Sequence, residues 1–156
     1  MDTGKWLISG GVFSASAIGM WMTQYLGLRN KYGEPIPQSV QEVMRPYFPE
    51  LDLSKVKIVY VEEMPVMIPS GVRAFTPLWN LIIHRGEWNF TTARGLGGLA
   101  NELTHIRQWK RYGFLFLPKF LYERIIYGFE GGVLEEESTN MGNIVMNDLI
   151  SQGYPV

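Results

Sequence analysis

Cysteine is absent from this chain of 156 residues, and histidine occurs only twice, at His84 and His105. Without cysteine the chain cannot form a disulfide, a thiolate metal site or a cysteine nucleophile. A metal site would therefore depend on oxygen ligands beside at most two imidazoles. Charge is also scarce: charged residues make up 19% of the chain, and 14 basic residues nearly balance 15 acidic ones. This balance creates no strong positive field, so we expect no nucleic-acid partner.

Aromatic residues are plentiful by contrast, at 13% of the sequence. A chain this rich in large apolar side chains can build a core, which excludes a disordered protein. The length matches one domain by the usual range of ~100–200 residues. The composition therefore predicts a single folded body rather than an array of domains.

A long stretch near the N-terminus, residues 6–28, carries no charge. A helix needs ~20 mostly apolar residues to cross a bilayer, so we predict a transmembrane helix within residues 1–30 and a single-pass membrane protein. A cleaved signal peptide and a helix buried in a soluble core are the alternatives. Lys5 on one side and Arg29 and Lys31 on the other tilt the globular part only slightly toward the cytoplasm, and the side stays open.

Small residues recur every fourth position along the predicted membrane helix, which places them on one stripe. They are Gly11, Ala15, Gly19, Thr23 and Gly27. Such a stripe lets another helix backbone approach closely in a membrane. We therefore predict that this stripe packs against other membrane-protein subunits, while the bulky residues of the helix face lipid or partner side chains.

The rest of the chain shows an α+β pattern. Pro35 and Pro37 interrupt residues 31–38, which we predict to be a linker before a globular domain at 39–156. A short helix from Ser39 is expected to precede a small antiparallel sheet. Its strands are expected at 55–61, 66–68 and 81–83. Leucines spaced by three and four then predict a helix from Thr92 to about Tyr112, and C-terminal helices follow to about residue 150.

Chemistry concentrates in residues 101–108 of that helix, which read NELTHIRQ. Asn101 and His105 are four residues apart and so share one helix face, as two metal ligands on a helix must. Glu102 lies beside them, where a general base could reach a metal-bound water.

This block resembles the HExxH zinc metallopeptidases, and specifically the minimal gluzincin-like domains, in which the line commonly reads HELTHxxQ. Tyr112-Gly113 and the acidic element EEES at 135–138 extend the similarity. The resemblance implies a zincin-like fold, with His105 as a metal ligand, Glu102 as the catalytic base and Glu135 as the third ligand. Glu136 is the runner-up for that third position, because the acidic triplet allows a shift of one residue.

The departure from the family pattern lies at Asn101, which stands where the family has its first zinc-binding histidine. A neutral amide oxygen is a far weaker zinc donor than imidazole, and catalytic zinc usually holds three good protein ligands. We therefore expect no cofactor, and we expect Asn101, His105 and Glu135 to form a buried hydrogen-bonded cluster. Rescue of the zinc site by His84 is the alternative.

Two functions follow from this reading. The first is a membrane-anchored pseudoenzyme that serves as a structural or interaction subunit of a larger membrane complex. The second is a membrane-anchored zinc metallopeptidase with an atypical ligand set, in which zinc is bound by His105, Glu135 and His84.

Basic residues also cluster in the second half of the sequence, among aromatic residues. They are Arg107, Lys110, Arg111, Lys119 and Arg124. Anionic lipid headgroups are a possible partner of such a patch, although ordinary helices also carry basic solvated faces.

Overall fold

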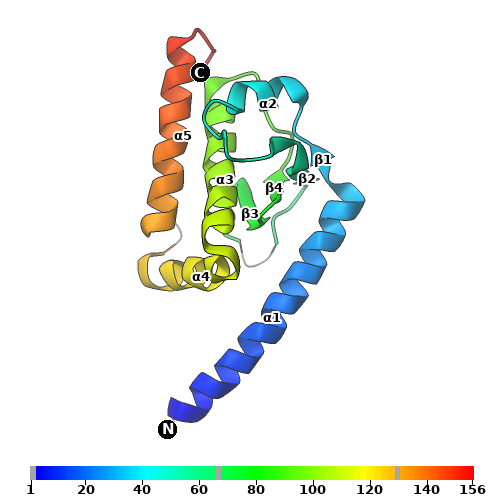
Figure 1. Cartoon of the computed structure of the whole chain (residues 1–156), viewed down its shortest axis with the longest axis vertical. Helices are drawn as coiled ribbons and strands as arrows, with labels where there is room; N and C mark the ends of the chain where they lie inside the picture. The colour runs from blue at the N-terminus through cyan, green and yellow to red at the C-terminus, as the bar shows by residue number, and fades with distance from the viewer. Residues whose placement is uncertain (1–2, 66–67, 129–130) are drawn as a thin grey trace.

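The computed structural model describes residues 3–65, 68–128 and 131–156, with side chains from residue 17 onward. Its helices are α1 (Thr3–Tyr32), α2 (Gln38–Met44), α3 (Ala93–Tyr112), α4 (Phe116–Tyr127) and α5 (Val133–Ser151). Its strands are β1 (Glu34–Pro35), β2 (Lys57–Val61), β3 (Ala74–Leu78) and β4 (Leu81–Arg85), and two short 3₁₀ turns are η1 (Leu53–Lys55) and η2 (Gly113–Leu115). Helices α3 and α5 lie side by side, and α4 crosses beside their lower ends (Figure 1).

The four strands form one mixed sheet in the order β1-β2-β4-β3. Strands β2 and β4 are parallel, whereas β1 pairs antiparallel with β2 and β3 pairs antiparallel with β4. The prediction of an antiparallel sheet is therefore wrong for its central pair. The reason is the path of the chain: after β2 it forms β3 at the edge of the sheet and not beside β2. A tight turn at residues 79–80 then brings β4 back between β2 and β3.

The sheet also differs from the predicted strands at two places. Strand β3 is absent from the prediction, because Pro77 breaks its apolar run. The expected strand at 66–68 rests on Val66 and Met67, which lie outside the described residues. Residues 34–35, predicted as linker, pair with β2 and extend the sheet.

Each face of the sheet is covered by a different helix, because successive side chains of a strand point to opposite faces. Ile58 and Ile82 are opposite each other in the register and pack against α3 in the main core. Val59 and Ile83 point the other way, into a second core with Tyr25 of α1. The second half of α1 thus closes a sheet face that would otherwise be exposed.

Among the described residues, no helix combines the length and hydropathy needed to span a bilayer. The predictions of a transmembrane helix within residues 1–30, of a membrane protein and of a single-pass location are therefore wrong. The charge-free run is diluted by serine, glycine, threonine and glutamine. Some of its large side chains also pack against the sheet. Tyr25 is buried there, and Trp21 packs beside it and donates its indole N–H to the carbonyl of Pro77 at 3.0 Å.

The small-residue stripe of α1 does not pack against this chain where the structure describes it. Gly19 and Gly27 have no atom within 4 Å of the position a Cβ would take, and Thr23 is exposed. Gly11 and Ala15 lie outside the described side chains. Contrary to our expectation, bulky side chains of α1 face the body of the protein.

Candidate functional site

Helix α3, which carries the NELTHIRQ block, is fixed at its start by local hydrogen bonds. The Thr92 hydroxyl caps the helix by accepting a hydrogen bond from the Gly95 N–H at 3.1 Å. Farther along, α3 and α5 approach at backbone distance, because both helices have glycine at the crossing. A Cβ on Gly142 would lie 2.9 Å from the carbonyl oxygen of Gly97. This close approach brings the first turns of α5 next to His105.

The orientation of the His105 ring is set by Gln108, one turn farther along α3. The side-chain amide of Gln108 donates to the carbonyl of Leu134 at 2.8 Å, so its oxygen is the acceptor that faces His105. His105 Nδ1 lies 2.9 Å from that oxygen and carries the proton. The other ring nitrogen, Nε2, therefore points toward Glu135, whose Oε2 is 3.5 Å away.

Glu135 has a second cationic partner that the sequence did not suggest. Arg124 of α4 donates from Nη2 to Glu135 Oε2 at 2.5 Å, and both side chains are largely buried. The guanidinium also lies 4.4 Å from the centroid of the Phe120 ring. The same oxygen that faces His105 is thus already bound to a fixed positive charge.

Electrostatics favour an ion pair between His105 and Glu135. Burial lowers the pKa of His105, but the hydrogen bond with Glu135 and the charges of Glu102 and Glu135 outweigh it and raise the pKa overall. Burial raises the pKa of Glu135, but His105 and Arg124 outweigh it and lower the pKa overall. Both pKa shifts favour the charged forms, the imidazolium of His105 and the carboxylate of Glu135.

Glu102 lies on the same helix but turns toward the sheet. Its Oε2 accepts a hydrogen bond from the Thr76 hydroxyl of β3 at 2.7 Å, and its side chain is buried. Burial raises the pKa of Glu102, although His105 and Thr76 act in the opposite direction. The carboxyl group is therefore more easily protonated than an exposed glutamate.

The Asn101 side chain makes a hydrogen bond to α5. Its side-chain nitrogen donates to the Ser138 hydroxyl at 3.3 Å, and Ser138 in turn donates to the backbone carbonyl of Glu135 at 2.9 Å. Asn101 therefore reaches Glu135 only through Ser138. This finding refines our expectation of one cluster of Asn101, His105 and Glu135.

A cavity of about 200 Å³ lies over the ion pair. Asn101, Glu102, His105, Arg124 and Glu135 line it, together with side chains from α1, α4, β3 and the segment before β3. His84 does not belong to this cavity. It lies in a neighbouring, more polar cavity that Asn101 and Glu102 also line, where Nδ1 is 2.9 Å from the Gly86 carbonyl and the ring stacks on Trp88.

The position of Glu136 can now be compared with that of Glu135. Glu136, the alternative to Glu135, is exposed and lies on the outer side of α5 beside Thr139 and Asn140. Sequence reasoning missed Thr76, which has no motif around it, and gave no role to Ser138, the last residue of the EEES element. It noted Arg124 only as part of a basic cluster, although its charge and its position before the acidic triplet were visible.

The donor set does not fit a catalytic zinc ion, which needs three good protein ligands. Within residues 3–65, 68–128 and 131–156, no three histidine or acidic side chains come close enough to hold a metal ion. His105 and Glu135 are the two that meet, and Arg124 occupies the facing oxygen of Glu135. The cluster satisfies its own charges without a metal.

The predicted basic patch is likewise engaged within the chain. Arg107 pairs with Glu50, Lys110 donates to the Glu50 carbonyl at 2.6 Å, and Arg111 pairs with Glu137. Lys119 and Arg124 pair with acidic residues as well. Contact with anionic lipid stays a prediction, but these cations already have partners.

Comparisons of the chain with models of protein families, with curated proteins and with solved structures returned no match. The resemblance to metallopeptidases therefore stays a prediction from the NELTHIRQ block, Tyr112-Gly113 and the EEES element at 135–138.

Proposed function

We propose that this chain is a metallopeptidase-like pseudoenzyme that acts as an interaction subunit of a larger protein assembly. The observation that carries the proposal is the guanidinium of Arg124 bound to the oxygen of Glu135 that also faces His105. In an HExxH enzyme, a zinc ion would supply positive charge between such a histidine and such a glutamate. Here the chain supplies that charge from its own arginine.

The position of Asn101 supports the same proposal. Its amide nitrogen donates to the Ser138 hydroxyl, so this side chain is bound to α5 at the position where the family has a zinc-binding histidine. Without a metal, Glu102 has no activated water to deprotonate, so the peptidase mechanism lacks both its Lewis acid and its nucleophile. What remains is a rigid polar cluster that holds α3, α4 and α5 together.

One observation favours the alternative, a zinc metallopeptidase with an atypical ligand set. Gln108 holds His105 so that Nε2 points toward Glu135, which is the orientation a metal-binding histidine needs. In that alternative His105 and Glu135 would bind zinc, and Glu102 would act as the base. His84 is a poor third ligand, because it does not line the cavity of His105 and Glu135 and its ring is stacked on Trp88.

Zinc content separates the two functions. The chain is purified without chelators, incubated with zinc, desalted and analysed for metal per chain. We expect well below one zinc in the unaltered protein. We expect zinc binding after the double change Asn101→His and Arg124→Leu, which adds an imidazole and releases Glu135. Asn101→Gln with Arg124→Leu is the matched control, since it also releases Glu135 but adds no imidazole.

Two results would overturn the proposal. The first is a zinc content of about one ion per unaltered chain, if His105→Ala removes that zinc. The other is hydrolysis of an unfolded protein such as casein that is lost in Glu102→Gln. For the interaction role, we expect the tagged chain to elute with a larger assembly from its own cells and Glu102→Gln to elute in the same way. Elution as a free chain contradicts that role.

A further inference from the structure

Helix α4 is attached to the body of the protein by its charged side. Glu123 is buried, and its carboxylate accepts a hydrogen bond from the Leu134 N–H at the start of α5, at 2.9 Å. Lys119 pairs with the same carboxylate at 3.0 Å, and Arg124 pairs with Glu135. The charges that normally face water on a surface helix therefore point inward here.

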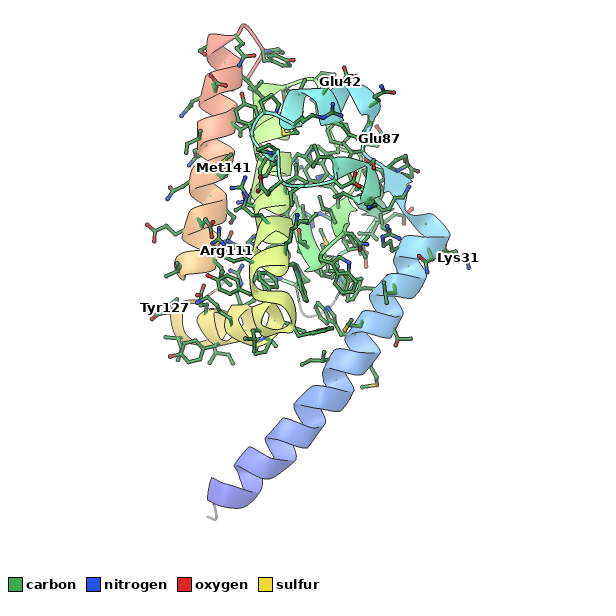
Figure 2. The ribbon with its side chains drawn as sticks, in the orientation of Figure 1. Lys31, Glu42, Glu87, Arg111, Tyr127 and Met141 are labelled. Atoms are coloured by element: carbon green, nitrogen blue, oxygen red, sulfur yellow. The ribbon has the colours of Figure 1, made fainter. Side chains whose placement is uncertain are left out.

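The opposite side of α4, together with η2, is apolar and exposed. We call it the outer face of α4, and it comprises Phe114, Leu115, Pro118, Leu121, Tyr122, Ile125 and Ile126. Ile125 is 81% exposed and Phe114 is 71% exposed. The helix ends at Tyr127, which lies below the start of α5 (Figure 2). Each member of this face is uncharged.

The spacing of the outer face is that of a helix-packing surface. Residues 114, 118, 121 and 125 are separated by four, three and four positions. This is the repeat of the a and d positions through which one helix packs against another. The spacing therefore indicates a helix as the partner of this face.

The size of the outer face also fits a protein interface. A fully exposed aromatic side chain presents roughly 150–250 Å², so seven residues at these exposures present on the order of 800 Å². The largest apolar patch of a typical monomer is only ~300–600 Å². A stable interface of standard size takes ~800 Å² from each partner. The outer face alone supplies that share.

We infer that the outer face of α4 is covered by the same face of a second copy of this chain, in a two-fold dimer. In a two-fold interface each residue lies near residues of its own kind, so charges on the face would repel their copies. The outer face has none, because the buried Glu123 and the largely buried Arg124 are paired, and the partly exposed Lys119 pairs with Glu123. Two such helices meet without like-charge repulsion.

The dimer does not depend on the state of the cluster around His105. It goes beyond the proposed function, since it names a specific surface and a specific partner. Metal analysis tests the cluster and oligomeric state tests the dimer, so the failure of one is distinguishable from the failure of the other.

Sedimentation of the full chain at about 100 µM tests the inference, with Ile125→Glu as the disrupting change. We expect a dimer for the unaltered chain and at least tenfold weaker self-association for Ile125→Glu, because it buries a charge in the interface. Ile144→Glu is the matched control. Ile144 is also an exposed isoleucine on a helix, at 59%, but it lies on α5 outside the outer face, and this variant should remain dimeric.

Crosslinking provides a second readout that does not rely on a disruptive change. Because the chain has no cysteine, Leu121→Cys introduces a single thiol near the middle of the outer face. We expect a short bifunctional maleimide to join two copies through this thiol but not through the control Ile144→Cys. Circular dichroism confirms that each variant is folded.

Three outcomes would overturn the inference. The first is an unaltered chain that is monomeric at about 100 µM. The second is a dimer that Ile125→Glu leaves unchanged. The third is a monomer that floats with phosphatidylcholine vesicles and loses this binding in Ile125→Glu, which would assign the face to lipid instead.

Discussion

Helices α4 and α5 follow α3 in sequence and both pack beside it, yet they do so with opposite sides. Helix α5 buries Leu134, Val145 and Leu149 and meets α3 at Gly142, while its charged residues are mostly outward. Helix α4 buries Phe116 and Leu117 at its start, but farther along it buries the charged Glu123 and leaves a row of apolar side chains exposed. The comparison shows that a helix can be held partly by buried charge and leave an apolar side available to a partner.

The largest effect is expected where α5 meets α3. A Cβ on Gly97 would lie 2.8 Å from the carbonyl oxygen of Gly142 and 2.9 Å from Cβ of Met146. Gly97→Val should therefore force the helices apart and lower the free energy of unfolding by about 3 kcal/mol. Urea denaturation followed by circular dichroism measures this change.

The neighbouring glycine is the control for this prediction. A Cβ on Gly98 meets only a Trp88 ring atom, at 3.9 Å. Gly98→Ala should raise the free energy of unfolding by roughly 0.5–1 kcal/mol, because alanine favours the helix. Equal losses in both variants would show that the close approach of α3 and α5 does not matter.

The next effect concerns the charged side of α4. Glu123→Ala removes the buried carboxylate that accepts from the Leu134 N–H and pairs with Lys119. We expect a loss of about 2 kcal/mol in the free energy of unfolding, together with faster amide exchange in α4. Hydrogen exchange measured by mass spectrometry checks the location of the change.

Leu121→Ala, on the outer face of the same helix, is the matching variant. Measured at a concentration where the chain is monomeric, it should change the free energy of unfolding by less than about 0.5 kcal/mol. If Leu121→Ala lowers the free energy of unfolding more than Glu123→Ala does, the side of α4 that carries Leu121 is buried and our assignment of its two sides is wrong.

A smaller effect on the free energy of unfolding is expected for Glu102→Gln, and here it is a gain. Burial raises its pKa above the ordinary value of 4.5, so the folded state binds the proton more tightly than the unfolded state. Its contribution to stability is complete below pH 4.5 and is lost as the pH rises through the folded value. Glu102→Gln keeps the shape without the charge and should have a higher free energy of unfolding than the unaltered chain at pH 7.

Unfolding curves at pH 4 and pH 7 test the sign of this effect. The gain from Glu102→Gln should be smaller at pH 4, where the unfolded state also binds the proton. A variant that loses stability at pH 7 would mean that the carboxylate is needed in its charged form, as a metal-associated base would be.

The smallest effect is expected at the surface pair of Arg111 and Glu137, which are 3.0 Å apart and partly exposed. Water and salt screen such a pair, so Arg111→Ala should cost about 0.5 kcal/mol or less. The loss should shrink further in 0.5 M salt. Thermal unfolding at low and high salt measures it, and a loss comparable to that of Glu123→Ala would remove the distinction between exposed and buried charges.

Local patterns predicted part of the fold. The spacing of Leu96, Leu99, Leu103 and Ile106 predicted α3, and all four side chains are buried in the main core. Strand β3 could not be predicted in this way, because Pro77 interrupts its apolar pattern. The strand is held in the sheet by its pairing with β4. The long charge-free run near the N-terminus was misleading, since a lack of charge suits a sheet face as well as it suits lipid.

The candidate site was predictable only within one helix. Helical spacing places Asn101, Glu102 and His105 together, because that geometry is fixed by four residues of backbone. Glu135 was assigned through a resemblance to a family motif. Arg124 and Ser138 reach the cluster from other helices, and their positions depend on how α3, α4 and α5 cross, which no local pattern encodes.

The outer edge of the sheet has a consequence for aggregation. An open strand edge can recruit another chain by hydrogen bonding, and proteins that avoid this block their edges. On β3 the Thr76 and Pro77 carbonyls accept hydrogen bonds from the indole N–H groups of Trp109 and Trp21, at 3.2 and 3.0 Å. Pro77 has no N–H to offer, and the register shifts between Phe75 and Leu78. Two tryptophans and one proline therefore protect this chain from growth into extended intermolecular sheets.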